Sequence, residues 1–262
     1  MIKVIAYYVS VILLFSKRFI FLIMALQPWR KAIVTRIEQE TPDTRRFWLE
    51  VPELPFIDFI PGQFITLDLP IHDKANKRWR SYSIASWPDK NNVLELLIVL
   101  NPQGTGTRYL FNEVTIGTEL VFRGPQGVFT LHQPIDKDLF LICTGTGIAP
   151  FRSMVNHIFH QQIPHRNIYL IYGCRKKDNL MYFDELKDLE RRLDGFHYVP
   201  TLSREEWEGK TGYVHEVYES ICNNKTPAQF YLCGWKDMIN EARQRIQEMG
   251  YEKKEIHVEL YG

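Results

Sequence analysis

The sequence predicts two domains, an antiparallel β-barrel followed by an α/β domain with a five-stranded parallel sheet. In the first half, short apolar runs are separated by Pro and Gly, which is typical of antiparallel strands joined by tight turns. In the second half, apolar runs alternate with helical stretches, which favours a parallel sheet with right-handed crossovers. The pattern changes near residues 134–137, so we expect a barrel over residues 28–135 and an α/β domain over residues 136–262.

Six runs rich in Val, Ile, Leu, Thr and aromatic residues predict the strands of the barrel. A short helix is expected between the last two of them, over residues 107–112. The strands are expected over residues 32–39, 44–51, 63–69, 81–85, 93–100 and 119–123.

Five apolar strands and four helices alternate in the predicted α/β domain. The strands are expected over residues 139–143, 167–172, 196–202, 229–232 and 256–260. The helices are expected over residues 151–161, 182–193, 214–221 and 236–248.

Composition and cysteine spacing exclude several classes of function. Hydrophobic residues make up 45% and charged residues 24%, as in ordinary globular proteins. The 32 Lys and Arg residues against 31 Asp and Glu give a net charge of +1, so we expect no nucleic-acid partner, because such binding relies on surplus positive charge. No CxxC pair or iron–sulfur spacing occurs, which predicts no metal site and reduced thiols in a cytoplasmic protein. The cysteines are Cys143, Cys174, Cys222 and Cys233.

The first 27 residues form an apolar extension outside both domains. Residues 4–15 and 19–26 are apolar apart from one serine, and Lys17 and Arg18 lie between them. A membrane-spanning helix needs about 20 apolar residues, and each central charge costs about 2.5–3.5 kcal/mol. Three interpretations remain: a start at Met24 with the preceding residues a gene-model artefact, which we favour, a membrane anchor, or an unremarkable extension.

A glycine-rich turn is the clearest local motif of the second half. Thr144, Gly145, Thr146 and Gly147 follow a predicted strand and precede a predicted helix that has Pro150 in its first turn. Glycines allow close approach of a ligand, and the exposed N–H groups of a helix start attract phosphate. Alone, this motif is equally consistent with a tight turn that binds nothing.

Two segments of the first half also have the chemistry of phosphate sites. Alternation along the predicted strand places Arg80 and Tyr82 on one face and Ser81 and Ser83 on the other. Arg is a bidentate phosphate donor, and Tyr offers a flat stacking surface. Residues 104–107, Gly-Thr-Gly-Thr, precede the short helix and form a second candidate. Each segment alone is also consistent with an ordinary strand or loop.

In this order, the motifs resemble those of the ferredoxin–NADP reductase superfamily of flavoproteins, over residues 30–262. The resemblance also includes Cys233-Gly234 and an ending similar to that of plant-type ferredoxin–NADP reductases. The quoted motifs are Pro61-Gly62-Gln63-Phe64, Arg80-x-Tyr82-Ser83, Gly124-Pro125-x-Gly127, Gly145 to Pro150, Cys233-Gly234 and His257-Val-Glu259-Leu-Tyr261.

The resemblance implies an FAD-binding barrel. Arg80 would pair with the FAD pyrophosphate, Tyr82 would pack on the flavin, and Ser83 would hydrogen-bond near its hydride-accepting nitrogen. Gly106 and Thr107 would hold phosphate, and Ser81 belongs to the same flavin motif.

The resemblance further implies a nucleotide domain in which residues 144–147 hold the pyrophosphate. Cys233, Gly234 and Glu259 would line the hydride-transfer pocket, and Tyr261 would cover the other face of the flavin until nicotinamide displaces it. The implied catalytic residues are Ser83, Cys233, Glu259 and Tyr261. Three departures stand out: Trp235 replaces a small residue, the strand at 97–100 lacks a Lys or Arg often found there, and Gly262 follows the terminal Tyr.

The choice of nicotinamide depends on the 2′-phosphate. Ser203 and Arg204 resemble the pair that binds this phosphate in NADP-specific members, and Tyr213 could stack on adenine. A cation and a hydroxyl suit a dianion. Residues 207–214 also resemble NADH-dependent oxygenase reductases, and a solvated loop is a further interpretation. We favour NADP(H) over NAD(H).

The expected function is transfer of electrons between NADPH and a one-electron carrier protein, a ferredoxin or flavodoxin, through FAD. No iron–sulfur module is encoded, so the carrier must be a separate protein. Alternatives are an NADH-dependent reductase component of an oxygenase system and a non-catalytic flavin-binding redox module. A local excess of cations before the flavin strand predicts docking of an acidic carrier; it comprises Lys74, Lys77, Arg78 and Arg80 against Asp73.

Overall fold

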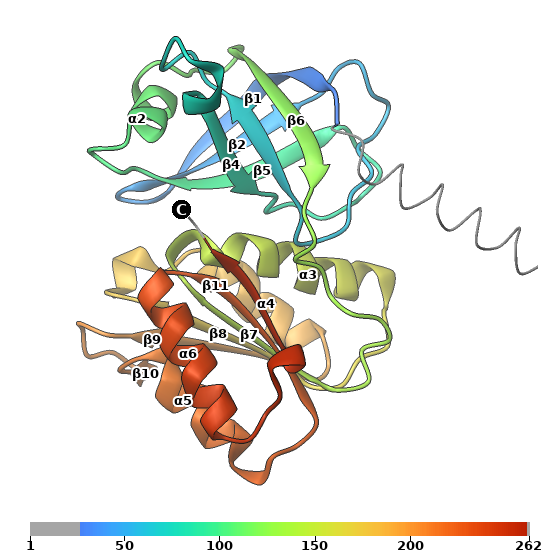
Figure 1. Ribbon diagram of the computed structural model, residues 1–262, viewed down its shortest axis with the longest axis vertical. Coiled ribbons are helices and arrows are strands. Elements are labelled where there is room, and N and C mark those ends of the chain that lie inside the picture. Colours follow the sequence, from blue (N-terminus) through green and yellow to red (C-terminus); the bar gives the residue numbers. More distant parts are fainter. Residues whose placement is uncertain (1–26, 261–262) are drawn as a thin grey trace, which may run out of the picture.

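Two six-stranded sheets, one antiparallel and one parallel, form the frame of the protein in the computed structural model, which describes residues 27–260 (Figure 1). The interpretations of the apolar extension and of Tyr261 and Gly262 fall outside this range. Within it, no helix is both long and apolar enough to cross a membrane.

The first sheet is the predicted barrel. All of its hydrogen-bonded neighbours are antiparallel, in the order β4-β3-β6-β1-β2-β5. A bridge between Ile84 and Leu96 joins the regions of the two outer strands, so the sheet closes on itself. The strands are β1 (Trp29–Thr41), β2 (Thr44–Glu50), β3 (Phe64–Asp68), β4 (Trp79–Ser83), β5 (Val93–Val99) and β6 (Glu119–Gln126).

Alternation of side chains explains the barrel core. On β2, Phe47 and Leu49 are buried inside, while the alternating residues Arg46 and Trp48 face outward and are only partly buried. The helix α2 (Thr105–Asn112) follows β5 and contributes Leu110 to the same core. It begins two residues before the prediction, so the glycine-rich segment forms its first turn.

The second sheet is parallel throughout, in the order β10-β9-β8-β7-β11-β12. The predicted count of five strands is wrong, because β10 is a sixth. Both residues of β10 are exposed and pair with β9 through the backbone alone, so no apolar pattern marks the strand. The strands are β7 (Asp138–Thr144), β8 (Ile168–Cys174), β9 (Phe196–Leu202), β10 (Lys210–Thr211), β11 (Ala228–Gly234) and β12 (Ile256–Leu260).

Helices cover both faces of the parallel sheet (Figure 1). The helices α3 (Ile148–Gln161) and α4 (Phe183–Arg192) pack on one face, and α5 (Val214–Ile221) and α6 (Lys236–Glu248) pack on the other. Short 3-10 turns complete the elements: η1 (Ala75–Lys77), η2 (Gly145–Gly147), η3 (Lys177–Asn179), η4 (Cys222–Asn224) and η5 (Lys253–Glu255).

The two halves share apolar packing where they meet. Ala85, Leu97 and Phe129 from the first half lie in the same buried cluster as the inner face of α3. The Phe129 ring centroid is 5.8 Å from that of Phe151 on α3 and 5.7 Å from that of Tyr231 on β11. The predicted boundary between residues 135 and 136 falls in the segment that joins β6 to β7.

Candidate active site

The strand order of the parallel sheet reverses between β7 and β11. From β7 the chain first moves outward through β8 and β9, and then returns to the other side of β7 through β11 and β12. In open α/β sheets, ligands bind outside the carboxyl ends of the strands at such a switch point. The two motifs predicted to bind the nicotinamide nucleotide, at residues 144–147 and 233–234, both lie there.

The two turns at the switch point fit closely together because of their glycines. A Cβ atom on Gly147 would lie 2.5 Å from the carbonyl oxygen of Cys233, and one on Gly234 would lie 2.4 Å from Thr144 Oγ1. The backbone N–H of Trp235 donates to Thr144 Oγ1 at 3.0 Å. This contact holds the turn in place at the start of α3, where backbone N–H groups favour a pyrophosphate.

Ser83 and Glu259 meet across the two halves of the molecule. Ser83 Oγ donates to Glu259 Oε2 at 2.9 Å, although the residues are 176 positions apart. Ser83 is the last residue of β4, and Glu259 on β12 pairs with Cys233 on β11. Three of the four predicted catalytic residues therefore converge, and Tyr261 lies outside the described residues.

Glu259 has altered acid–base chemistry at this junction. Burial raises the pKa of its carboxyl to about 7, and the hydrogen bond from Ser83 opposes only part of this rise. Burial acts in this direction because it disfavours the charged form. The group can therefore hold or release a proton near neutral pH.

The two predicted anion sites of the barrel form one site. The Arg80 side chain lies 3.0 Å from the position a Cβ atom on Gly106 would take, and Arg80 Nη2 donates to Thr105 Oγ1 at 3.4 Å. A guanidinium thus lies beside the first turn of α2, whose N–H groups have no partner within the helix. The Thr107 hydroxyl bonds both backbone groups of Asn101, at 3.0 and 3.1 Å.

The remaining residues of the flavin motif alternate as predicted. Tyr82 packs against the barrel core, and burial raises the pKa of its phenol. Ser81 is exposed on the opposite face, and its Oγ lies 3.0 Å from Thr66 Oγ1. Arg80 and Tyr82 are therefore together, and Ser81 faces away from them.

The residues predicted to select the nucleotide lie together at the carboxyl ends of β8 and β9. Ser203 Oγ donates to the carbonyl of Cys174 at 3.3 Å, and the backbone N–H of Arg204 donates to the carbonyl of Arg175 at 3.0 Å. A backbone bond of 2.9 Å from Gly212 to Leu202 brings the neighbouring Tyr213, 68% exposed, to the same edge. The sequence analysis missed Arg175, which lies at the same edge. The sequence signal for it is the run of three cations at residues 175–177, directly after a buried strand.

Trp235 covers the nucleotide turn. Its side chain is 68% exposed, and its Nε1 lies 3.9 Å from the position a Cβ atom on Gly145 would take. From sequence this residue was only a departure from the family pattern. In the structure its indole forms one wall of the site.

Comparison with known proteins identifies the family. Models of an oxidoreductase FAD-binding domain and an oxidoreductase NAD-binding domain match residues 31–131 and 141–244. Ferredoxin–NADP reductase B of Sorangium cellulosum is 32% identical over 212 residues, which cover 78% of this chain and 85% of that protein. The chain belongs to the ferredoxin–NADP reductase superfamily. The predicted resemblance, the barrel and the α/β domain are confirmed.

Other members of the superfamily are similar over most of the chain. The electron transfer component of anthranilate 1,2-dioxygenase from Acinetobacter baylyi is 30% identical over 233 residues, 87% of this chain. The chain spans 66% of that relative and 61% of the corresponding 2-halobenzoate 1,2-dioxygenase component of Burkholderia cepacia. The crystal structure of a ferredoxin NADP+ reductase from Neisseria gonorrhoeae with bound FAD and NADP has a TM-score of 0.75 and 25% identity, and covers 88% of this chain and 98% of that one.

The residues of this superfamily member fit both of its cofactors. Arg80 and the open first turn of α2 suit the pyrophosphate of FAD, and the glycine-rich turn at the start of α3 suits that of a nicotinamide nucleotide. The chain thus has an FAD-binding domain and a nicotinamide-nucleotide-binding domain.

Proposed function

We propose that the protein takes a hydride from NADPH and passes electrons singly to a separate carrier protein, a ferredoxin or a flavodoxin. The observation that carries the proposal is the Ser83–Glu259 hydrogen bond of 2.9 Å. It joins the end of the flavin strand to the strand beside Cys233, which is the place where nicotinamide and flavin must meet. FAD, when bound, supplies the capacity to accept a hydride and release single electrons.

The side chains of this site bind, orient and handle protons. Arg80 binds the FAD pyrophosphate together with Gly106 and Thr107, and Tyr82 packs on the flavin. The turn at 144–147 binds the nucleotide pyrophosphate. Fixing both cofactors in one orientation turns their encounter into an intramolecular event. Glu259 and Ser83 hold a proton beside the reacting rings.

The preference for NADPH follows from the edge formed by β8 and β9. Arg204 and Arg175 are exposed there beside Ser203, and a guanidinium is a strong, bidentate partner for a phosphate dianion. Glu205 and Glu208 at the same edge are engaged with Lys177, through its backbone N–H at 3.1 Å and its Nζ at 2.8 Å. These contacts turn the two acidic groups toward a cation.

The carrier would dock beside η1. Of the four predicted cations, Arg78 is paired with Asp68, with N–O distances of 2.7 and 2.5 Å, and Arg80 lies against Gly106. Lys74 and Lys77 remain exposed on the barrel. The proposed docking surface is therefore these two lysines, and its partner is an acidic protein surface.

A second candidate is an NADH-dependent reductase component of an oxygenase system. Relatives named as dioxygenase electron transfer components, together with the segment at 207–214, favour it. A non-catalytic flavin module is the third candidate. The contact between Ser83 and Glu259 argues against it, because a scaffold needs no such junction.

Anaerobic titration of the purified protein separates these candidates. We expect a yellow protein with about one FAD per chain, whose flavin is reduced by NADPH at lower concentration than by NADH and reoxidised by ferricyanide. Preference for NADH would favour the oxygenase component. A bound flavin that neither nucleotide reduces would favour the non-catalytic module, and a colourless folded protein would contradict the FAD site.

Two further proposals concern the cell. We propose a cytoplasmic protein, with membrane association through residues 1–26 where that segment is retained. Fractionation of cells that express the full sequence, or a version beginning at Met24, tests this. Recovery of both forms in the membrane fraction would contradict the role given to the extension.

A further inference from the structure

We propose that the buried pair formed by Arg152 and Glu95 is a positioning device that holds the nucleotide turn in register with the flavin strand and so sets the rate of hydride transfer. The inference rests on the proposed function. Neither residue was a candidate from sequence, where Arg152 is only a lone cation inside an apolar helical stretch.

Arg152 connects the two halves of the molecule through a single guanidinium. It lies on α3, the helix that begins at the nucleotide turn, and its side chain is 4% exposed. Two of its hydrogen bonds stay within its own domain, to the two carboxylate oxygens of Glu185 at 2.8 Å each. Two others cross to the barrel, to the Ala85 carbonyl and to Glu95 Oε2, at 2.9 Å each.

Glu95 is the matching anchor on the barrel side. Its side chain on β5 is 4% exposed, and Oε1 accepts hydrogen bonds from Arg46 Nε at 2.6 Å and from the Tyr182 hydroxyl at 2.9 Å. Burial alone would raise the pKa of Glu95, but the charges of Arg152 and Arg46 outweigh it and hold the pKa below its ordinary value. The carboxylate is therefore charged, and both of its oxygens are engaged.

The pair lies on a short path between the two cofactor sites. Ala85 follows Ser83 by two residues, and its backbone N–H donates to the carbonyl of Glu95 at 2.8 Å. Arg152 is in the second turn of the helix that starts at the nucleotide loop. A shift of α3 relative to β4 must therefore break hydrogen bonds of Arg152.

A second contact holds the far end of the same helix. The Trp87 ring of the barrel half stacks on His160, near the end of α3, with centroids 5.1 Å apart and planes at 13°. The Arg152 guanidinium also lies 5.3 Å from the centroid of the Trp87 ring. The helix is thus fixed at two points along its length.

Stability alone does not account for the pair. A buried ion pair is often no more stabilising than well-packed apolar residues of the same volume, because desolvation offsets its attraction. Unlike the apolar contacts around Phe129, however, its hydrogen bonds have direction and admit one arrangement. Direction matters here because a displacement of about 1 Å of reacting groups can slow a reaction by about 100-fold.

Two glutamates on opposite sides of one guanidinium provide a matched test. Glu95→Gln removes charge from the contact between the domains, and Glu185→Gln makes the same chemical change within one domain. Both are studied as FAD-loaded protein by stopped-flow absorbance. The measured quantities are flavin reduction at saturating NADPH, the dissociation constant of NADPH and reoxidation by ferricyanide.

We expect Glu95→Gln to slow flavin reduction at least about tenfold more than Glu185→Gln does. Nucleotide affinity and reoxidation by ferricyanide should change by less than about threefold, since neither needs the two domains in register. Tyr182→Phe, which removes one hydrogen bond to Glu95, should slow reduction in the same direction to a smaller extent and serves where Glu95→Gln does not fold.

Equal slowing in the two glutamine variants would overturn the inference. The inference would also be overturned if Glu95→Gln lost FAD and slowed both flavin reduction by NADPH and reoxidation by ferricyanide. That result would mean that the pair only stabilises the fold. If neither nucleotide reduces the wild-type flavin, the proposed function is wrong and the inference falls with it. A wild type that is reduced normally, beside a Glu95→Gln variant with an unchanged rate, overturns the inference only.

Discussion

Glu259 is the residue of the candidate site whose protonation near neutral pH the fold changes. Alone in water, a glutamate is fully charged at neutral pH, whereas burial beside Ser83 raises the pKa of this carboxyl to about 7. The folded protein therefore binds a proton that the unfolded chain has released between pH 4.5, the ordinary value, and about 7. The stability that this proton gives is complete below pH 4.5 and is lost as the pH rises toward 7.

Glu259→Gln should remove this part of the pH dependence. We expect the free energy of unfolding of the wild type to fall more between pH 5 and pH 7.5 than that of the variant, as measured by urea denaturation. Glu206→Gln, an exposed glutamate after β9, is the control and should follow the wild type. Parallel curves for wild type and Glu259→Gln would contradict the assignment of the shifted group.

Arg80→Ala should weaken retention of FAD. The change removes a charge-assisted contact worth about 1.5–3 kcal/mol, which corresponds to about 10- to 150-fold in the dissociation constant. Flavin absorbance after exhaustive dialysis measures the loss. The control is Arg191→Ala, because Arg191 is paired with Asp188 on α4 of the other domain. Equal FAD content in both variants would show that Arg80 does not bind the pyrophosphate of FAD.

Single residues also show what the sequence could and could not reveal. Arg80 and the segment at 104–107 are both recognisable as anion-binding candidates, but their contact depends on how β4 and α2 pack. Ser83 and Glu259 were brought together only by the resemblance to the family. Arg152 and Glu95 could not be predicted, because nothing in a sequence reports that two charged side chains will be buried facing each other.

At the scale of the element, periodicity predicted the strands and helices that bury an apolar face. The bounds of β9, β12, α5 and α6 match the prediction. The strands β9 and β12 and the helix α5 begin and end at apolar residues, and the apolar positions of α6 recur at helical spacing from Met238 to Ile246. The strand β10 was missed, since its two exposed residues bury nothing. The start of α3 was placed three residues late, because the glycine-rich motif runs directly into its first turn.

The edge formed by β8 and β9 should decide the choice of nucleotide. Arg204→Ala should raise the Michaelis constant for NADPH at least about tenfold and leave that for NADH nearly unchanged, because only NADPH carries the phosphate that the residue would bind. Steady-state reduction of ferricyanide measures both constants. Arg192→Ala on α4, paired with Asp188, is the matched control. Equal losses with both nucleotides would indicate a folding defect instead.

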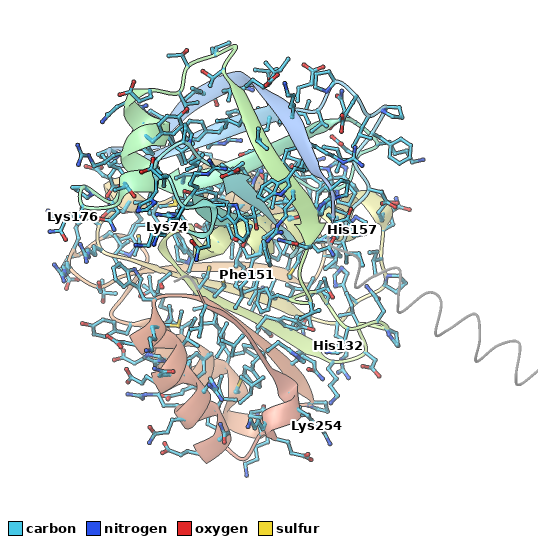
Figure 2. All side chains as sticks on the ribbon, turned by 45° about the horizontal axis from the view of Figure 1, so that its top comes forward. Lys74, His132, Phe151, His157, Lys176 and Lys254 are labelled. Atoms are coloured by element: carbon cyan, nitrogen blue, oxygen red, sulfur yellow. The ribbon has the colours of Figure 1, made fainter. Side chains whose placement is uncertain are left out.

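At the scale of the whole molecule, charge is nearly balanced, with a total of +1, so association with a partner must rely on local surfaces. Lys74 and Lys77 are exposed at η1 of the barrel half, and Lys253 and Lys254 are exposed at η5 of the nucleotide half. Figure 2 shows Lys254 near the bottom of the view and Lys74 at about half its height. Lys253 and Lys254 can therefore serve as control residues when the role of Lys74 and Lys77 in docking is tested.

Reversal of Lys74 and Lys77 to Glu should slow reduction of an acidic carrier such as flavodoxin and spare reduction of ferricyanide by NADPH. The loss should shrink as salt is added, because screening acts over about 8 Å at physiological ionic strength. Reversal of Lys253 and Lys254 at η5 makes the same change in charge elsewhere and should have little effect. Unchanged carrier reduction at low salt in the Lys74 and Lys77 variant would exclude this docking surface.

Trp235 gives the molecule an optical reporter at its nucleotide turn. The chain has six tryptophans, and the indole of this one stands in solvent directly over Gly145. Acrylamide in solution quenches the fluorescence of such an exposed ring, whereas a nucleotide lying on the turn would shield it. The difference in quenching between the protein and its Trp235→Phe variant therefore registers the arrival of a nucleotide without any turnover, even in protein stripped of its flavin.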